Sequence, residues 1–342
     1  MSATLAQIAQ QAGVSQATVS RVINGKPGVS QDRRAAVMQA LGSMGIPTDR
    51  VLRTGTKLTA IVAPDLANPI FPQFVTGLVS RLAQLDHLAI TCTYTPAGTS
   101  EESFLNLLQT QPIDSAVFLS GRYDTRDASL AQYTPLIADR GIPAAFLNGA
   151  VRDMDGLYVA TDDAAAITMA LRHLKDLGHR RIGLSLGDRN HYPSIMKYKA
   201  AMRFFEEEGI EHGDELTTWT TYGVTSGRMS AATLLDNGAT AIACASDQLA
   251  LGAIRAASLM GLSVPRDVSI TGYDDSPLIA SMTPPLTTIR QPVERMCQAT
   301  VDGLMAMLGN RSLAKQRDAM LFEPELVVRE STGPVNTTAR NV

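Results

Sequence analysis

The stretch from residue 4 to residue 29, TLAQIAQQAGVSQATVSRVINGKPGV, most constrains what this chain can fold into. Thr4 and Gln7 have the spacing of a helix-capping box, and apolar residues then recur at helical intervals. Gly13 interrupts this pattern, and Ser15 is suited to cap a second short helix. Two short helices joined by a glycine turn make a helix-turn-helix. An ordinary helical hairpin is the alternative, and periodicity alone does not separate the two.

The second helix carries small or hydrogen-bonding residues that can enter a major groove and touch base edges and phosphates. These residues are Gln16, Ala17, Thr18, Ser20 and Arg21. Gln16 and Ala17 are predicted to choose bases, and Arg21 to add a base or phosphate contact. Thr4, Ser15 and Asn24 complete the DNA-contacting set predicted for this part of the chain.

The net charge is divided unevenly along the chain. The 342 residues carry a formal charge of -3, but residues 1–57 hold seven Lys or Arg and two Asp, which leaves -8 for the remainder. A basic head on an acidic body suggests that only the head meets a polyanion. Chain length suggests two or three domains, and a hydrophobic content of 45% is enough to bury sizeable cores.

The segment AGVSQATVSRVING, which begins at Ala12, resembles the DNA-binding segment of the LacI (lactose repressor) family, whose pattern is approximately AGVS-x-x-TVSRV-x-N. Later segments match in the family's order: PDLANPIF from Pro64, LGHRRIG from Leu177, SDQLALGA from Ser246, VPRDVSITGYDD from Val264 and PPLTTIRQP from Pro284. The resemblance covers nearly the whole chain. It implies a transcription regulator whose core is similar to a periplasmic sugar-binding protein.

Four regions are expected along the chain. Residues 1–44 should form an all-α helix-turn-helix head, in which Ser30 caps a third helix. Gly and Pro residues make 45–57 a linker. Residues 58–330 alternate short apolar strands with amphipathic helices, including one near 128–140, which predicts two doubly wound parallel-sheet lobes. The polar segment 331–342 is expected to be a flexible tail.

Polar or aromatic residues follow several of the predicted strands, where ligands bind to such sheets. The candidates for an effector site between the lobes are Asn68, Ile70, Phe71, Arg122, Asn148, His191, Lys197, Tyr222, Asp247, Asp274 and Gln291. Each has an ordinary structural alternative as a cap, a turn residue or a solvated side chain. Asp247 is equally a good helix N-cap, and Asp274 could simply shape a turn.

The family resemblance assigns roles to several of these positions. It places Asp247 and Asp274 where carboxylates accept hydrogen bonds from ligand hydroxyls or ring nitrogens, and Tyr222 and Phe71 where aromatic rings flank the ligand. Lys197 stands where the family often has an arginine. Asn148 and Ile70 also depart from the family's residues, which changes the expected sugar specificity. On the same resemblance, residues 286–291 cross back, so the helix near 292–308 belongs to the first lobe, and Gln291 lies near the ligand.

The linker departs most from the family, in which a hinge helix wedges a leucine into the minor groove. Here the distance from Pro47 to Leu52 is shorter by about two residues, or roughly half a helical turn. Leu52 is predicted to remain the wedge that bends the operator. A flexible tether between head and core is the alternative.

Other functional classes have little support in the sequence. No dinucleotide fingerprint, Walker sequence or nucleophile elbow occurs, so neither an enzyme nor a cofactor is expected. The three cysteines and five histidines show no metal-ligand spacing. No signal peptide or membrane-spanning run is present, and a cytoplasmic protein is expected.

The sequence therefore predicts a homodimeric transcription regulator, most simply a repressor. An approximately palindromic operator and a carbohydrate effector are its predicted partners. The rival is a cytoplasmic small-molecule-binding protein without a DNA role, which the DNA-binding head opposes.

Overall fold

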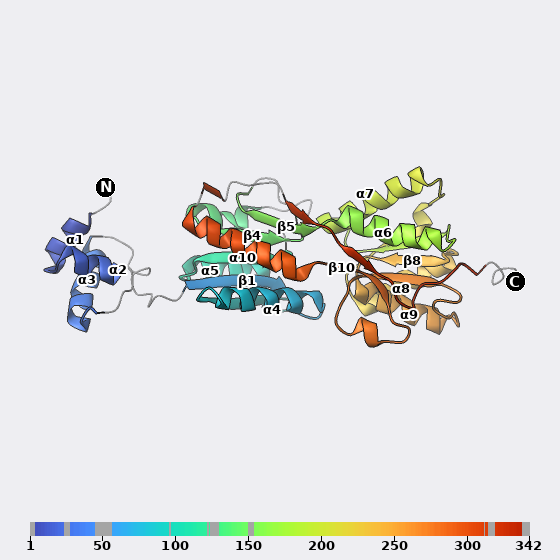
Figure 1. Ribbon diagram of the computed structural model, residues 1–342, viewed down its shortest axis with the longest axis horizontal. Helices are drawn as coiled ribbons and strands as arrows, with labels where there is room; N and C mark the ends of the chain where they lie inside the picture. Colours follow the sequence, from blue (N-terminus) through green and yellow to red (C-terminus); the bar gives the residue numbers. More distant parts are fainter. Residues whose placement is uncertain are drawn as a thin grey trace.

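The computed structural model of the protein describes residues 4–23, 28–44, 57–95, 97–121, 123, 130–149, 154–310, 312–313 and 319–336. Three helices form the head at one end of Figure 1: α1 (Leu5–Ala12), α2 (Gln16–Ile23) and α3 (Gln31–Ser43). Their common core holds Ile8, Val19, Val22, Val37 and Leu41. Ser30 occupies the N-cap position of α3, but its side chain makes no capping hydrogen bond.

Two lobes follow, and twelve described strands form one six-stranded sheet in each. Lobe 1 contains β1 (Lys57–Pro64), α4 (Ile70–Ala83), β2 (His87–Tyr94), α5 (Glu101–Thr110), β3 (Ser115–Leu119), β4 (Ala144–Leu147), β5 (Leu157–Thr161), α10 (Val293–Gly309) and β11 (Met320–Phe322). Its strand order is β11-β5-β4-β3-β1-β2. The described pairs in this sheet are all parallel, as the alternation of strands and helices predicts.

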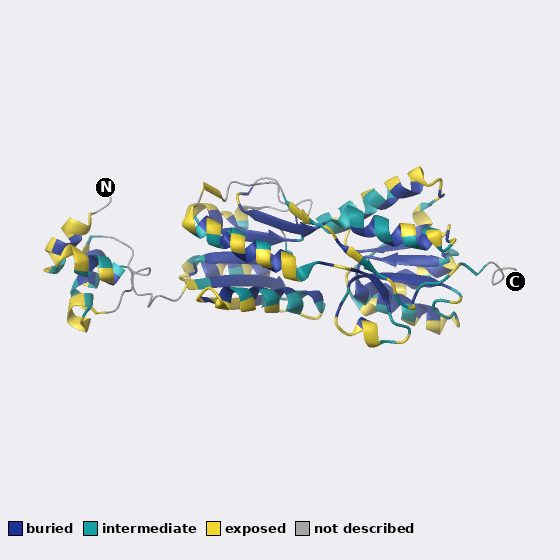
Figure 2. Cartoon of the chain, in the orientation of Figure 1, coloured by how far each residue is buried: buried dark blue, intermediate teal, exposed yellow. Residues whose placement is uncertain are grey.

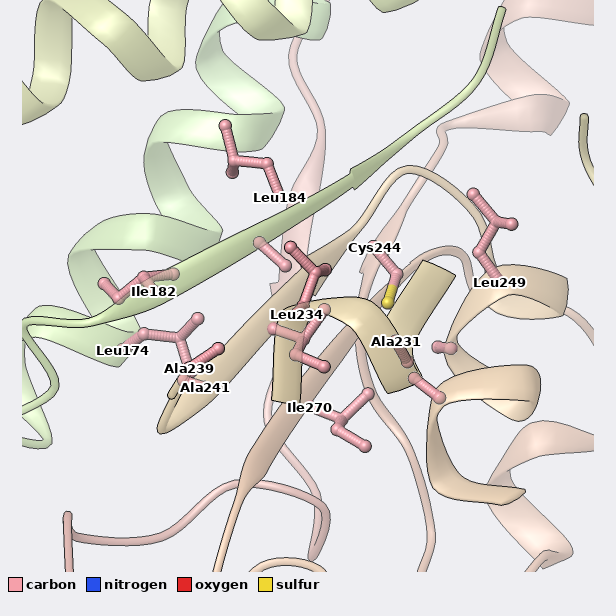
Figure 3. Packing of buried hydrophobic residues seen from close by; sticks show 14 of the residues in the cluster. Leu174, Ile182, Leu184, Ala231, Leu234, Ala239, Ala241, Cys244, Leu249 and Ile270 are labelled. Carbon is pink, nitrogen blue, oxygen red and sulfur yellow. The ribbon is translucent and has the colours of Figure 1, made fainter. Parts of the chain in front are cut away.

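Lobe 2 repeats this architecture. It contains α6 (Asp163–Asp176), β6 (Ile182–Leu186), α7 (Tyr192–Glu207), β7 (Thr217–Trp219), α8 (Val224–Asp236), β8 (Ala241–Cys244), α9 (Asp247–Leu259), β9 (Ser269–Asp274), β10 (Thr287–Arg290) and β12 (Glu325–Val327). The strand order is β12-β10-β9-β8-β6-β7, and only the described pair β10–β12 is antiparallel. The central strands of both sheets are buried, and exposed positions lie mainly on the helices (Figure 2). Figure 3 shows Leu184, Leu234, Cys244 and Leu249 packed in the core of lobe 2.

The chain passes between the lobes at three crossovers. β5 leads to α6, β10 leads to α10, and β11 leads to β12 (Figure 1). The expected return of the chain is confirmed, because α10 packs against α4 and β5 of lobe 1. The residues before it, Thr287–Arg290, are a full strand of the second sheet rather than only a crossing segment.

The expected helix near 128–140 is wrong in its type. The segment is helical, but as a 3-10 helix at Leu130–Gln132 and a π-helix at Pro135–Asp139 rather than as one α-helix. Pro135 lacks the N–H that a continuous helix would need there.

The expected flexible tail is also wrong for its described part. Ser331 is fully buried, and its hydroxyl donates to the Ile270 carbonyl oxygen at 2.6 Å. The Gly333 carbonyl oxygen lies 3.1 Å from the His179 ring, and Val335 N donates to the Leu177 carbonyl oxygen at 2.9 Å. Polar composition suggested fraying, but these backbone and side-chain hydrogen bonds fix the segment to lobe 2.

Among the described residues, no helix has the length and apolar character needed to span a membrane. The three cysteines are buried and form no disulfide.

Candidate functional site

The first helix of the head begins and ends as its sequence predicts. Thr4 N donates to Gln7 Oε1 at 2.8 Å, and Gln7 N donates to Thr4 Oγ1 at 3.4 Å, which completes the capping box. Gly13 has a φ of +62°, a left-handed conformation that a glycine adopts without a Cβ clash. The turn between the two helices therefore rests on this glycine.

The second helix separates an apolar face from a polar one. Val19 and Val22 are fully buried, whereas Gln16, Ala17 and Arg21 are exposed. Thr18 and Ser20 are half-buried, and Ser15 Oγ accepts from Thr18 N at 3.1 Å. The exposed positions are those predicted to contact DNA. Asn24, Leu52 and Arg122 lie outside the described residues.

A second group of polar residues lies where the lobes meet, at the carboxyl ends of the strands. Lobe 1 contributes Asn68 after β1, Asn148 after β4 and Thr161 at the end of β5. Lobe 2 contributes Asp247 after β8, Asp274 at the end of β9 and Gln291 after β10. Parallel sheets present their carboxyl ends on one edge, which is why residues this far apart in sequence meet.

Hydrogen bonds join these residues across the boundary. Gln291 Oε1 accepts from Asn148 Nδ2 at 3.0 Å and from Thr161 Oγ1 at 2.8 Å. Gln291 Nε2 donates to Asp274 Oδ1 at 2.7 Å, and the Asn68 side chain also hydrogen-bonds the Asp274 carboxyl. A further bond from Gln248 Nε2 to the Ala67 carbonyl oxygen, at 2.6 Å, links the lobes.

The two carboxyl groups on the lobe 2 side are almost fully buried. Asp247 accepts from Ser276 N at 2.7 Å and from Thr288 Oγ1 at 2.6 Å, while Ser246 is the N-cap of α9. Burial raises the pKa of Asp247 to about 6, although these hydrogen bonds act in the opposite direction. Burial, and then the charge of Asp247, raise the pKa of Asp274 well above its usual range. Two poorly solvated acceptors thus lie side by side.

Asp274 also has an unusual backbone. Its φ is +122° and that of Asp275 is +56°, so the predicted turn exists here. The side chains separate within it, because Asp275 binds Arg290 and Arg329, whereas Asp274 binds Gln291 at the boundary. The structural and the functional interpretations of Asp274 are therefore compatible.

Lys197 is held in a buried ion pair rather than pointing freely toward a ligand. Its ammonium group contacts Asp163 Oδ1 and lies 3.9 Å from the centre of the Tyr273 ring. The Tyr273 hydroxyl donates to the same Asp163 oxygen at 3.0 Å. Lys197 therefore connects α7, α6 and β9, and its charge opposes part of the rise in the pKa of neighbouring Asp274.

The aromatic and apolar candidates have different surroundings. Tyr222 is 37% exposed, and its hydroxyl is 3.2 Å from Ser194 Oγ. His191 is the N-cap residue of α7. Ile70 is buried in the core of lobe 1, and the half-buried Phe71 packs against the same core. Of the predicted set, hydrogen bonds bring together Asn68, Asn148, Asp274 and Gln291.

Several residues of this boundary were missed by sequence reasoning. Thr161 ends a strand, LYVAT, whose short apolar run is a recognisable signal. Asp163, Tyr273, Thr288 and Gln248 give no such signal, because each matters through a partner from another part of the chain. Within the described residues, no three His, Cys, Asp or Glu side chains gather as a possible metal site.

Comparisons with known protein families find matches both for the head and for part of the two-lobed core. Residues 4–46 match the family of bacterial regulatory proteins of the lacI type, and residues 171–332 match a periplasmic binding protein-like domain. The chain is 40% identical over 338 residues to the HTH-type transcriptional regulator reg1 of Streptomyces lividans, covering 97% of each chain. It is 39% identical to the HTH-type transcriptional regulator MalR of Streptomyces coelicolor, again covering 97% of each.

Solved structures agree along nearly the whole length. The cellobiose complex of the transcriptional regulator CelR matches with a TM-score of 0.72 and 27% identity, over 96% of this chain and all of that one. A lac repressor dimer bound to operator and an anti-inducer matches with a TM-score of 0.71 and 27% identity, over 97% of this chain and all of that one. From the head, the two lobes and this full-length identity, the chain belongs to the lacI family of DNA-binding transcriptional regulators.

Proposed function

We propose that the protein represses transcription as a homodimer and that an uncharged carbohydrate, bound between the lobes, changes its affinity for operator DNA. The observation that carries the proposal is the pair of buried carboxyl groups, Asp247 and Asp274, beside amides from the other lobe. Carboxyl oxygens accept hydrogen bonds, so the pair suits a ligand rich in hydroxyl donors. The similar regulator CelR was solved with cellobiose, which supports a sugar in this place.

DNA recognition is assigned to α2. Gln16 and Ala17 would contact base edges, Arg21 a base or a phosphate, and Thr4, Ser15, Thr18, Ser20 and Asn24 the backbone around them. Leu52 would wedge into the minor groove at the centre of the operator. Two heads related by a two-fold axis would read an approximate palindrome.

Dimerisation is assigned to the edge of lobe 1 formed by β2 and the neighbouring α4. Four large apolar side chains are exposed there: Val79 (37%), Leu85 (47%), Leu88 (60%) and Ile90 (43%). A second copy of the chain is the proposed occupant, because the similar lac repressor was solved as a dimer on operator. Leu88→Glu should convert the dimer to monomers in sedimentation experiments, whereas an unchanged dimer would place the interface elsewhere.

The experiment that tests DNA reading is selection from random DNA. Wild-type protein should enrich a palindrome, and a variant at Gln16 and Ala17 should enrich a different sequence, since each mismatched base contact costs about 1–3 kcal/mol. Recovery of the parental sequence by the variant would exclude these residues as the base readers.

Effector binding is tested by thermal shift and operator affinity together. A sugar that binds the folded protein raises its melting temperature, and an effector also changes the operator dissociation constant. Cellobiose is the first compound to test, followed by other neutral sugars. If no sugar changes operator affinity, the carbohydrate assignment is wrong.

A further inference from the structure

We propose that Gln291 transmits occupancy of the effector site to the crossovers between the lobes, acting as a positioning residue. The inference rests on the proposed function, which places the effector against Asp274. Gln291 lies in the second crossover, between the end of β10 at Arg290 and the start of α10 at Val293. It is 5% exposed, so its side-chain amide must find its partners inside the protein.

The Gln291 amide contacts three elements that the sequence separates widely. Its oxygen accepts from Asn148, after β4, and from Thr161, which ends β5 at the first crossover. Its nitrogen donates to Asp274, at the end of β9 in lobe 2. Both oxygen lone pairs and one of the two amide hydrogens are thereby used. The amide is a junction between lobes and crossovers, with little capacity left for a ligand.

This junction links two kinds of residue. Asp274 and Asn148 occupy positions assigned to the effector site, whereas Thr161 and Gln291 belong to two of the three crossovers that must bend when the lobes move. The Thr161 bond therefore ties one crossover to another. Asn148 Oδ1 also accepts from Thr161 N at 3.2 Å, which closes a ring of hydrogen bonds around the first crossover. Movement of the Gln291 amide should therefore change the hydrogen bonds of both crossovers.

Competition for Asp274 provides the coupling. A ligand hydroxyl that donates to Asp274 Oδ1, the oxygen that accepts from Gln291 Nε2, competes with that bond, and a weakly bonded buried donor is unfavourable. Turning or moving the amide relieves this competition, but the amide oxygen is held by two donors from lobe 1. Ligand contact at Asp274 thus changes the hydrogen bonds of the crossovers. Because the two states differ in these bonds, the ligand can shift the equilibrium between lobe arrangements.

Hydrogen exchange on the full-length protein without effector tests the junction. Gln291→Met removes the amide at similar length, and Gln298→Met is the matched control, since Gln298 is an exposed glutamine on α10. Peptides covering residues 145–149, 158–163 and 272–275 should exchange about tenfold faster in Gln291→Met, as expected when local opening becomes easier. The control should exchange like wild type. Unchanged exchange in Gln291→Met would overturn the proposal.

Coupling is measured separately, with cellobiose as the probe. For Gln291→Met the cellobiose dissociation constant should stay the same or fall, because a donor that competes for Asp274 is removed, while the effect of saturating cellobiose on operator affinity should fall about tenfold. A large loss of cellobiose affinity with intact coupling would make Gln291 a direct ligand contact and overturn the positioning role.

The two measurements separate this proposal from the proposed function. If cellobiose and other neutral sugars leave wild-type operator binding unchanged, the proposed effector class fails. The exchange experiment needs no ligand, so it still decides whether Gln291 holds the crossovers.

Discussion

Lobe 1 and lobe 2 share an architecture but differ in the chemistry of their strand ends. Lobe 1 presents neutral groups at the boundary, chiefly Asn68, Asn148 and Thr161. Lobe 2 presents the buried carboxyl groups of Asp247 and Asp274. The repeated fold fixes where ligand-contacting residues can stand, whereas a few side chains after the strands set which ligand is favoured.

The helix pairs of the lobes differ as well. In lobe 2, α8 and α9 approach so closely that a Cβ on Gly252 would overlap the Val224 carbonyl oxygen, and one on Gly227 would overlap the Leu249 backbone. In lobe 1, α4 meets α10 at Gly77, where a Cβ would lie 2.8 Å from Cys297 Sγ, a side-chain atom that can move. Lobe 2 should therefore be less tolerant of a side chain added at the glycines between its packed helices.

The largest difference in stability between the lobes is expected when an ion pair is broken in each. Lys197→Met would leave the Asp163 carboxylate buried with only its Tyr273 hydrogen bond, and removing one partner of a buried pair costs about 3–5 kcal/mol. In lobe 1, Glu294→Gln breaks an ion pair with Arg81 in which Glu294 is 90% exposed, and should cost less than about 1 kcal/mol. Urea unfolding of both variants measures the comparison. Equal losses of unfolding free energy in the two variants would show that burial does not make the Lys197–Asp163 pair more important for stability.

The next largest difference in stability is expected for alanine substitutions at glycines between packed helices. Gly252→Ala forces two helix backbones apart and should destabilise the protein at or above the upper end of the roughly 1–3 kcal/mol typical of overpacking. Gly77→Ala should cost clearly less, because Cys297 can adjust. Thermal unfolding with a probe in each lobe would reveal the contrast. A milder effect at Gly252 would mean that α8 and α9 can separate without loss.

The pH dependence of the unfolding free energy should report on the buried carboxyl group of Asp247 in lobe 2. The pKa of Asp247 is about 6 in the folded protein against 3.8 as its ordinary value, so the folded state binds more protons between these values. The contribution of Asp247 to the unfolding free energy should therefore fall by about 3 kcal/mol as pH rises through this window and stay level above it.

Asp247→Asn removes that fall while keeping one acceptor for Ser276 N and a donor for Thr288. The difference between wild-type and variant curves reports Asp247 together with its effect on the pKa of Asp274, because burial lowers the pKa values of His173 and His179 in both proteins. Parallel curves from pH 4 to pH 7 would contradict the raised pKa.

The smallest expected effect concerns ligand binding at the two sides of the boundary. Asp274→Ala should weaken binding of the identified sugar by about 1–3 kcal/mol, because ligand hydroxyls lose a buried acceptor. Asn148→Ala should weaken it less, and operator affinity without sugar should remain within a few-fold of wild type in both. Calorimetry measures the sugar dissociation constants of both variants. A greater loss for Asn148 would reverse the proposed division between lobes.

Much of the fold was accessible from the sequence because its signals are local. The capping box at Thr4 and Gln7, the glycine turn and the alternation of strands with helices depend on residues within a few positions of each other. The short strands β7, β11 and β12 have three residues each and were not predicted, since so few residues give no periodic signal. The described tail segment was misread because its buried hydrogen bonds depend on partners far away in sequence.

By itself, the sequence determined the helix-turn-helix head, the two α/β lobes and the family, through periodicity, caps and motifs that survive without knowledge of contacts. Only the tertiary structure decided how the polar candidates pair. Gln291 and Asn148 are 143 positions apart, and Lys197 and Asp163 are 34 apart. Which carboxyl group finds an amide and which finds an ammonium depends on the packing of whole lobes, because burial forces each polar group to take the nearest partner that the fold supplies.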